Sequence, residues 1–151
     1  MIFVALVRPH LEYGAAIWNP FLAKDIDSIE SIQRRATKSI PECRRMNYET
    51  RLKSIQLPTL EYRRHRGDII QYYKIHKNLN KVNWYTKQNI SSHEYPTRHH
   101  NTITREINKS NIRFNFFKNR IVDQWNKIPS AIREAENTNA FKNNYDKLLL
   151  F

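Results

Sequence analysis

Glycine and cysteine are scarce in this chain of 151 residues, which contains only two glycines and one cysteine. Because a phosphate-cradling loop needs clustered glycines, the isolated Gly14 and Gly67 argue against a nucleotide-hydrolysing site. The single Cys43 excludes an intramolecular disulfide and the paired cysteines of a zinc ribbon or zinc knuckle. The scarcity of glycine, with six prolines at the ends of predicted segments, favours helices joined by proline-containing turns.

Long apolar runs are also missing. The N-terminal run MIFVALV is apolar for only seven residues before Arg8 and Pro9, and no basic region precedes it. The run is too short to span a bilayer and lacks the form of a signal peptide. With the lone cysteine, this predicts an intracellular protein of the nucleus, the cytoplasm or both, neither secreted nor membrane-bound.

Acidic residues are too few to balance the basic ones. The chain has 26 lysines and arginines against 14 acidic residues, a net charge of +12 that attracts polyanions and opposes self-association. Between Arg34 and Arg66, ten basic residues face only three glutamates. Nucleic acid is therefore the leading candidate partner, and a merely solvated basic surface is the alternative.

Three helices are predicted in the first half of the chain. Apolar residues recur at helical spacing from Leu22 to Ile40, where Pro41 ends the pattern. A short helix is expected over 48–55 with Asn47 as its N-cap. A long helix should start at 58 or 59 and end near 79.

Gly67 lies inside this long predicted helix, where it costs about 1 kcal/mol relative to alanine. The sequence therefore predicts that another element packs closely there. A neighbouring helix backbone is the first interpretation, and a nucleic-acid backbone is the alternative.

Two further helices are predicted near the C-terminus. One carries Phe114, Phe117, Ile121 and Trp125 on a single aromatic face and ends at Pro129. The other is expected over 138–149, capped by residue 138 or 139. The apolar faces of these two helices are predicted to pack on each other.

Residues 80–111 lack this regularity, since they are polar and rich in asparagine, and only 102–107 alternates like a short strand. The predicted fold is therefore mostly α: two helical lobes, as a small helical bundle, joined by a long polar connection, with at most a short β element near 102–107. The predicted domains are a basic helical lobe (1–79), a polar linker or insertion (80–111) and a C-terminal helical hairpin (112–151).

No constellation for catalysis is present in the sequence. Metal-dependent polymerases and nucleases need paired carboxylates, whereas Asp25 and Asp27 lie at a helix start, where capping explains them. Cys43 has no fixed partner that would activate it, and a structural thiol is the simpler interpretation. The histidines that could bind a metal lack helical spacing or a nearby thiol: His93, His99 and His100. The sequence predicts a non-catalytic chain without metal or cofactor.

Aromatic residues are interleaved with the basic ones, a pattern typical of grooves that follow a nucleic-acid backbone. Aromatics at helical spacing are more often core residues. Only Tyr62, Tyr72 and Tyr85 are therefore considered as residues that stack on bases.

Several segments occur in an order that is far more specific than any one of them. They are RPHLEYGAAIWNP (8–20), IESIQRRATKSI (29–40), YETRLKSIQLPTLEYRRHRGDIIQYYKI (48–75), TRHH (97–100), FFKNRIVDQWNKIP (116–129) and NAFKNNYDKLL (139–149). In this order the chain resembles the C-terminal, thumb-like region after the polymerase active site in reverse transcriptases of jockey-like, non-long-terminal-repeat retrotransposons. It departs from the family at Thr97-Arg98-His99-His100, where the family usually has Thr-Arg-Gly-His.

The resemblance implies a parent enzyme with an endonuclease and an RNA-directed DNA polymerase that copies its own RNA at a nicked chromosomal target. The fingers, the palm with its Tyr/Phe-x-Asp-Asp motif and the endonuclease have no counterpart in this sequence, so no enzymatic activity is expected of this chain alone. The resemblance implies a place beside the RNA or DNA template–primer duplex, with the remainder of the reverse transcriptase as a further partner.

The predicted function is therefore non-catalytic binding of template–primer backbone through basic helix faces, with no small-molecule ligand and no membrane. The alternative is a protein-interaction or scaffold module that docks on the rest of the polymerase. The residues predicted to contact phosphates are Arg34, Arg35, Lys38, Arg63, Arg64 and Arg66.

Overall fold

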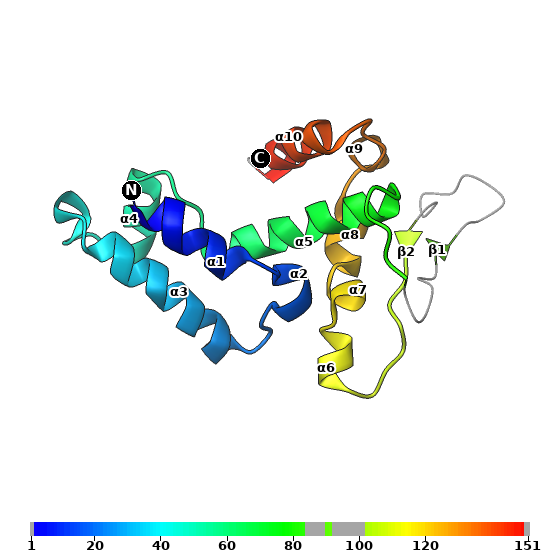
Figure 1. Cartoon of the computed structure of the whole chain (residues 1–151), viewed down its shortest axis with the longest axis horizontal. Helices are drawn as coiled ribbons and strands as arrows, with labels where there is room; N and C mark the ends of the chain where they lie inside the picture. The colour runs from blue at the N-terminus through cyan, green and yellow to red at the C-terminus, as the bar shows by residue number, and fades with distance from the viewer. Residues whose placement is uncertain (1, 84–89, 92–101, 150–151) are drawn as a thin grey trace. The chain divides into compact units, whose positions relative to one another are not determined.

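The structure is a computed structural model that describes residues 2–83, 90–91 and 102–149 (Figure 1). The fold is mostly α-helical, which confirms the predicted fold class. Packing divides the chain into two compact units, Met1–Gly67 and Asp68–Phe151. This division falls inside a long helix, whereas the sequence analysis ended its first lobe at residue 79.

The first unit is built from short and long helical segments. In chain order these are a π-helical turn η1 (Phe3–Val7), α1 (Arg8–Glu12), α2 (Ala15–Trp18), α3 (Ala23–Lys38), a 3-10 turn η2 (Pro41–Cys43), α4 (Tyr48–Ser54) and the first part of α5 (Leu60–His76). The three helices predicted for this half are confirmed as α3, α4 and α5, with slightly different ends. Asn47 caps α4 as predicted, because its Oδ1 accepts a hydrogen bond from the backbone N–H of Thr50 at 2.8 Å.

Helix α3 packs through polar residues, which its apolar periodicity did not predict. Its most buried side chains are Glu30, Gln33 and Thr37, while the isoleucines that predicted the helix are half-buried. Glu30 Oε2 accepts hydrogen bonds from the backbone N–H groups of Leu60 at 3.0 Å and Glu61 at 3.4 Å. A carboxylate at this position satisfies donors that a helix start leaves unpaired and offsets the positive end of the helix dipole. Glu30 therefore ties the start of α5 to α3.

Two further side chains complete this junction. The hydroxyl of Tyr48 in α4 donates a hydrogen bond to the carboxylate of Glu30. Gln33 donates from Nε2 to Tyr48 Oη at 3.1 Å and to the carbonyl of Pro58 at 3.0 Å. Burial, followed by the hydrogen bond to Glu30, raises the pKa of Tyr48. Helices α3, α4 and α5 are thus joined through one buried polar cluster.

Gly67 lies within α5, and the predicted close approach of another element is wrong for the described structure. Apart from its chain neighbours and the adjacent backbone of α5, no atom lies within 4 Å of the position that a Cβ would occupy at Gly67. The glycine has an ordinary helical backbone and is exposed. The described chain therefore offers no packing reason for a glycine at this position.

The second unit contains the rest of α5 and the C-terminal helices. Its other elements are β1 (Ile90–Ser91), β2 (Thr102–Ile103), α6 (Asn111–Phe114), α7 (Phe117–Arg120), α8 (Val122–Lys127), α9 (Ser130–Arg133) and α10 (Thr138–Leu149). The predicted helix over 138–149 is confirmed as α10. Its N-cap is one residue earlier than predicted, since Asn137 Oδ1 accepts a hydrogen bond from the N–H of Ala140 at 2.8 Å.

Aromatic rings form the core of this unit. Tyr73 of α5 stacks on Phe141 of α10 with ring centroids 4.2 Å apart, and Tyr72 meets Trp125 of α8 edge-on at 4.7 Å. The rings of Trp125 and Phe141 lie 6.2 Å apart, which confirms the predicted packing of the last two apolar faces at this point. Such pairs add about 0.5–1.5 kcal/mol beyond the burial of their area.

A buried ion pair adds to the same packing. Both carboxylate oxygens of Asp68 accept hydrogen bonds from the guanidinium of Arg120, at 2.8 and 2.9 Å. Residues of α5 that follow Gly67 thus pack on α7, α8 and α10, and this explains why the second unit begins at Asp68.

The predicted single helix over 112–129 is wrong, because the chain is broken there into α6, α7 and α8 (Figure 1). Phe116 has an extended backbone, with φ −64° and ψ 151°. Asparagine side chains bind backbone carbonyls at the break: Asn119 Nδ2 donates to the carbonyl of Arg113 at 2.9 Å, and Asn115 Nδ2 donates to that of Asn111 at 2.8 Å. Such side-chain bonds compete with the helical pattern.

The predicted short β element near 102–107 is present as β2, which is limited to Thr102–Ile103. It pairs antiparallel with β1, with Ile90 opposite Ile103. The side chain of Asn126 in α8 bonds both backbone groups of Ile103, as a neighbouring strand would. Its Oδ1 accepts from the N–H of Ile103 at 3.0 Å, and its Nδ2 donates to the carbonyl of Ile103 at 2.9 Å.

Candidate nucleic-acid interface

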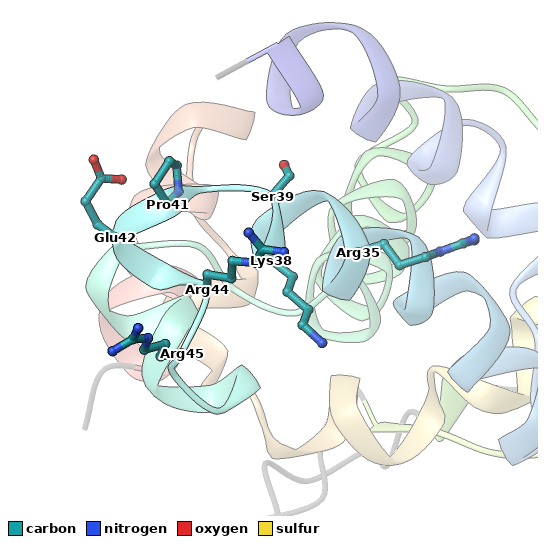
Figure 2. A pocket seen from close by; sticks show the side chains of 7 residues that line it. All are labelled: Arg35, Lys38, Ser39, Pro41, Glu42, Arg44 and Arg45. Carbon is teal, nitrogen blue, oxygen red and sulfur yellow. The ribbon is translucent and has the colours of Figure 1, made fainter.

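A basic hollow of about 720 Å³ lies where α3 ends and η2 begins (Figure 2). The local sequence explains its shape. Ser39 ends α3 and donates its hydroxyl to the carbonyl of Ala36 at 2.7 Å, and Pro41 starts η2. Cys43 is buried, whereas the residues on either side of it face solvent. The hollow is lined by Arg35, Lys38, Ser39, Pro41, Glu42, Arg44 and Arg45.

Four of these side chains are exposed cations, and Glu42 is the only carboxylate among the lining residues. Within the described part of the chain, Arg35, Lys38, Arg44 and Arg45 form no ion pair. In the view of Figure 2, Lys38 and Arg44 lie between Arg35 and Arg45, and the carboxylate of Glu42 is directed away from them. We call these four cations the basic row. Their positive charge is available to an external anion.

Arg34, the first residue predicted to contact phosphate, is exposed but has partners within the chain. Its Nη2 lies 3.3 Å from a carboxylate oxygen of Asp27, and its guanidinium lies 5.2 Å from the ring centroid of Tyr48. An exposed pair of this kind contributes at most about 1 kcal/mol, so a phosphate can compete with Asp27 for Arg34.

The predicted phosphate-contacting residues on α5 are largely paired or buried within the described structure. Arg63 forms a two-point ion pair with Glu12, with Nη2 2.8 Å from Oε2, and Arg8 Nε lies 3.3 Å from the same carboxylate. Burial, and then the neighbouring charge of Arg63, lower the pKa of Arg8. Arg64 is only 1% exposed, so its guanidinium does not reach a phosphate from this position, and Arg66 is half-buried. A carboxylate 51 residues away in sequence thus pairs with Arg63, and the packing of α5 buries Arg64.

The structure therefore brings Arg35 and Lys38 of the predicted set together with two residues that the sequence analysis did not single out. Arg44 and Arg45 were part of the basic excess between residues 34 and 66. The signal that marks them is the turn Ile40-Pro41, which reverses the chain and returns the next basic pair towards the end of α3.

Of the tyrosines considered for base stacking, Tyr72 is buried and is not available to a base. It is 4% exposed and packs against Trp125, and burial raises its pKa to about 12. Tyr62 is partly exposed. Tyr85 lies outside the described residues.

The described residues contain neither a cluster of metal-binding side chains nor a membrane-spanning helix. No group of three histidine, cysteine, aspartate or glutamate side chains gathers there as a metal site. His93, His99 and His100 lie outside the described ranges. Across 2–83, 90–91 and 102–149, every helix is too short or too polar to cross a bilayer.

Comparison of the chain with protein-family models, curated proteins and solved structures found no match.

Proposed function

We propose that this chain is a non-catalytic nucleic-acid-binding module that accepts the phosphate backbone along the basic row. The observation that carries the proposal is the row itself: Arg35, Lys38, Arg44 and Arg45 line one hollow without a carboxylate partner among the described residues. Arginine and lysine side chains that face solvent bind phosphates independently of base sequence.

The proposal extends to the biological setting that the sequence resemblance implies. The module would be the C-terminal region of a jockey-like retrotransposon reverse transcriptase, an RNA-directed DNA polymerase. There it would bind the backbone of the RNA or DNA template–primer. The positive net charge of +12 supports such a partner, because it draws a polyanion towards the chain.

Salt dependence gives the proposal a quantitative test. Each phosphate that a cation neutralises on a B-form duplex adds about 0.9 to the slope of log affinity against log salt concentration. Four cations engaged together contribute about 3–4 to that slope. Replacing Arg35, Lys38, Arg44 and Arg45 together by glutamine should remove this contribution.

A matched control keeps the total charge of the two variants equal. Four exposed lysines away from the hollow are replaced by glutamine: Lys24, Lys53, Lys127 and Lys147. Binding of a labelled duplex is followed by fluorescence anisotropy over a series of salt concentrations, with thermal melts to check folding. The slope should flatten in the basic-row variant and change little in the control. Equal slopes in both variants would refute the assignment of the row.

A second candidate function is the protein-interaction module, and the N-terminal segment favours it. Within residues 2–22 several large apolar side chains face solvent, among them Tyr13 at 83% and Ile17 at 82% exposed. The partner in this case would be the rest of the polymerase. A purified chain that shifts neither RNA nor DNA in a gel at low salt would favour docking over nucleic-acid binding.

A further inference from the structure

Two phenylalanine rings on the second unit face solvent, although the sequence placed one of them in the core. Phe114 at the end of α6 is 44% exposed, and Phe116 just before α7 is 37% exposed. The break between α6 and α7 is what turns Phe114 away from the face that carries the buried Phe117 and Trp125.

Each of these rings is paired with a guanidinium group that is itself anchored. The Cζ of Arg105 lies 4.9 Å from the ring centroid of Phe114, and Arg105 Nη2 is held 2.6 Å from Asp123 Oδ2. The Cζ of Arg113 lies 5.4 Å from the ring centroid of Phe116, and its Nη2 is held 2.7 Å from Glu106 Oε2.

The carboxylate of Glu106 is fixed in its turn. Glu106 also accepts a hydrogen bond from the buried Lys118 at 2.7 Å, and its backbone N–H donates to Asn119 Oδ1 at 2.9 Å. The two exposed rings are therefore held in place by packed neighbours. An exposed aromatic surface that is already fixed loses little conformational entropy when a flat ligand stacks on it.

The charge around the rings indicates which kind of partner they suit. Three cations and two carboxylates are linked around the rings, so the cluster keeps a positive excess: Arg105, Arg113 and Lys118 against Glu106 and Asp123. Lys109 is exposed and forms no ion pair with any described residue. An apolar protein face would not require this excess, whereas single-stranded nucleic acid combines flat bases with anionic phosphates.

We propose that Phe114 and Phe116 form a stacking platform for the unpaired bases of single-stranded RNA or DNA. Bases within a duplex already stack on both faces, so the platform selects unpaired segments. This goes beyond the proposed function, which concerns phosphates alone and involves residues of the first unit only.

Alanine variants of the two rings test the proposal. Phe114→Ala and Phe116→Ala should each weaken binding of a single-stranded pyrimidine oligonucleotide by about 5- to 150-fold, the loss that corresponds to one stacked base. The slope of log affinity against log salt should stay unchanged, because no cation is removed. Binding of a fully paired duplex should also stay unchanged. Tyrosine at either position should restore binding, because it keeps the ring.

Ile112→Ala provides the matched control, since Ile112 is 76% exposed on α6 and is aliphatic. It should leave oligonucleotide affinity unchanged. An equal loss for Ile112→Ala and the phenylalanine variants would identify a general apolar docking surface and overturn the platform, as would unchanged affinity in both phenylalanine variants. Failure of the wild-type chain to bind single strands would also overturn it.

Each of the two proposals can be refuted independently of the other. If the basic-row variant keeps its salt slope while the phenylalanine variants lose single-strand affinity, the platform stands and the role of the row is refuted. If the phenylalanine variants bind normally while the basic-row variant loses its slope, the row stands and the platform is refuted.

Discussion

Removal of the Glu30 carboxylate should destabilise the first unit strongly. Glu30 is 5% exposed and accepts from the backbone N–H of Leu60 and of Glu61 as well as from the Tyr48 hydroxyl. In Glu30→Ala these donors lose their acceptor while still buried or half-buried. A buried donor left unsatisfied costs about 1–3 kcal/mol, and breaking a buried charged network costs about 3–5 kcal/mol. We expect Glu30→Ala to lower the free energy of unfolding by about 3–4 kcal/mol.

Two variants divide this loss among its parts. Tyr48→Phe removes only the hydroxyl and should cost about 1–2 kcal/mol. Glu30→Gln keeps an acceptor oxygen but loses the charge that faces the start of α5, so its cost should fall between those of the other two variants. Urea unfolding followed by far-ultraviolet circular dichroism measures all three. A Glu30→Ala variant within about 0.5 kcal/mol of the wild type would refute the role assigned to this junction.

Two further predictions concern α5. Gly67→Ala should raise the free energy of unfolding by about 0.5–1 kcal/mol, because the added Cβ meets no atom within 4 Å and alanine favours the helix; a lower urea midpoint would contradict this. Partial desolvation, followed by the charges of Lys77 and Arg133, lowers the pKa of His76 from its ordinary value of 6.5. Because the unfolded chain then binds a proton more readily, stability should fall as the pH drops below about 6.5 towards the folded pKa. His76→Gln should remove that part of the pH dependence, and an identical pH profile in the variant would contradict the sign.

Features that depend on neighbouring residues were predictable from the sequence. The helix α4 has the predicted Asn47 cap, and α10 has the predicted range, because capping and apolar periodicity act within a few residues. The mostly α fold follows from the same local signals.

Features that depend on distant or side-chain partners were not predictable in this way. The helix predicted over 112–129 is interrupted where Asn115 and Asn119 bind backbone carbonyls through their side chains. Periodicity does not reveal such bonds. Gly67 was assigned a packing role from its helical cost alone, and only the three-dimensional arrangement shows the open space around it.

The residues of the candidate site likewise divide into those predictable from neighbouring residues and those that depend on distant partners. Arg35 and Lys38 belong to the exposed side of a well-predicted helix. Arg63 was predicted to lie on an exposed face. Its partner Glu12 lies 51 residues earlier in the sequence, and a local helical pattern does not reveal such a distant ion pair. Arg44 and Arg45 join the basic row only through the turn at η2, whose direction the sequence analysis did not predict.

The proposed function depends most directly on where a nucleic-acid backbone contacts the folded chain. Amide NMR spectra of the isotope-labelled protein, recorded during titration with a short double-stranded oligonucleotide, would locate that contact. We predict that the largest shifts occur over residues 35–45, around Arg35, Lys38, Arg44 and Arg45, and that they diminish as salt is added. Saturable binding that leaves the amides of 35–45 unshifted would contradict the account.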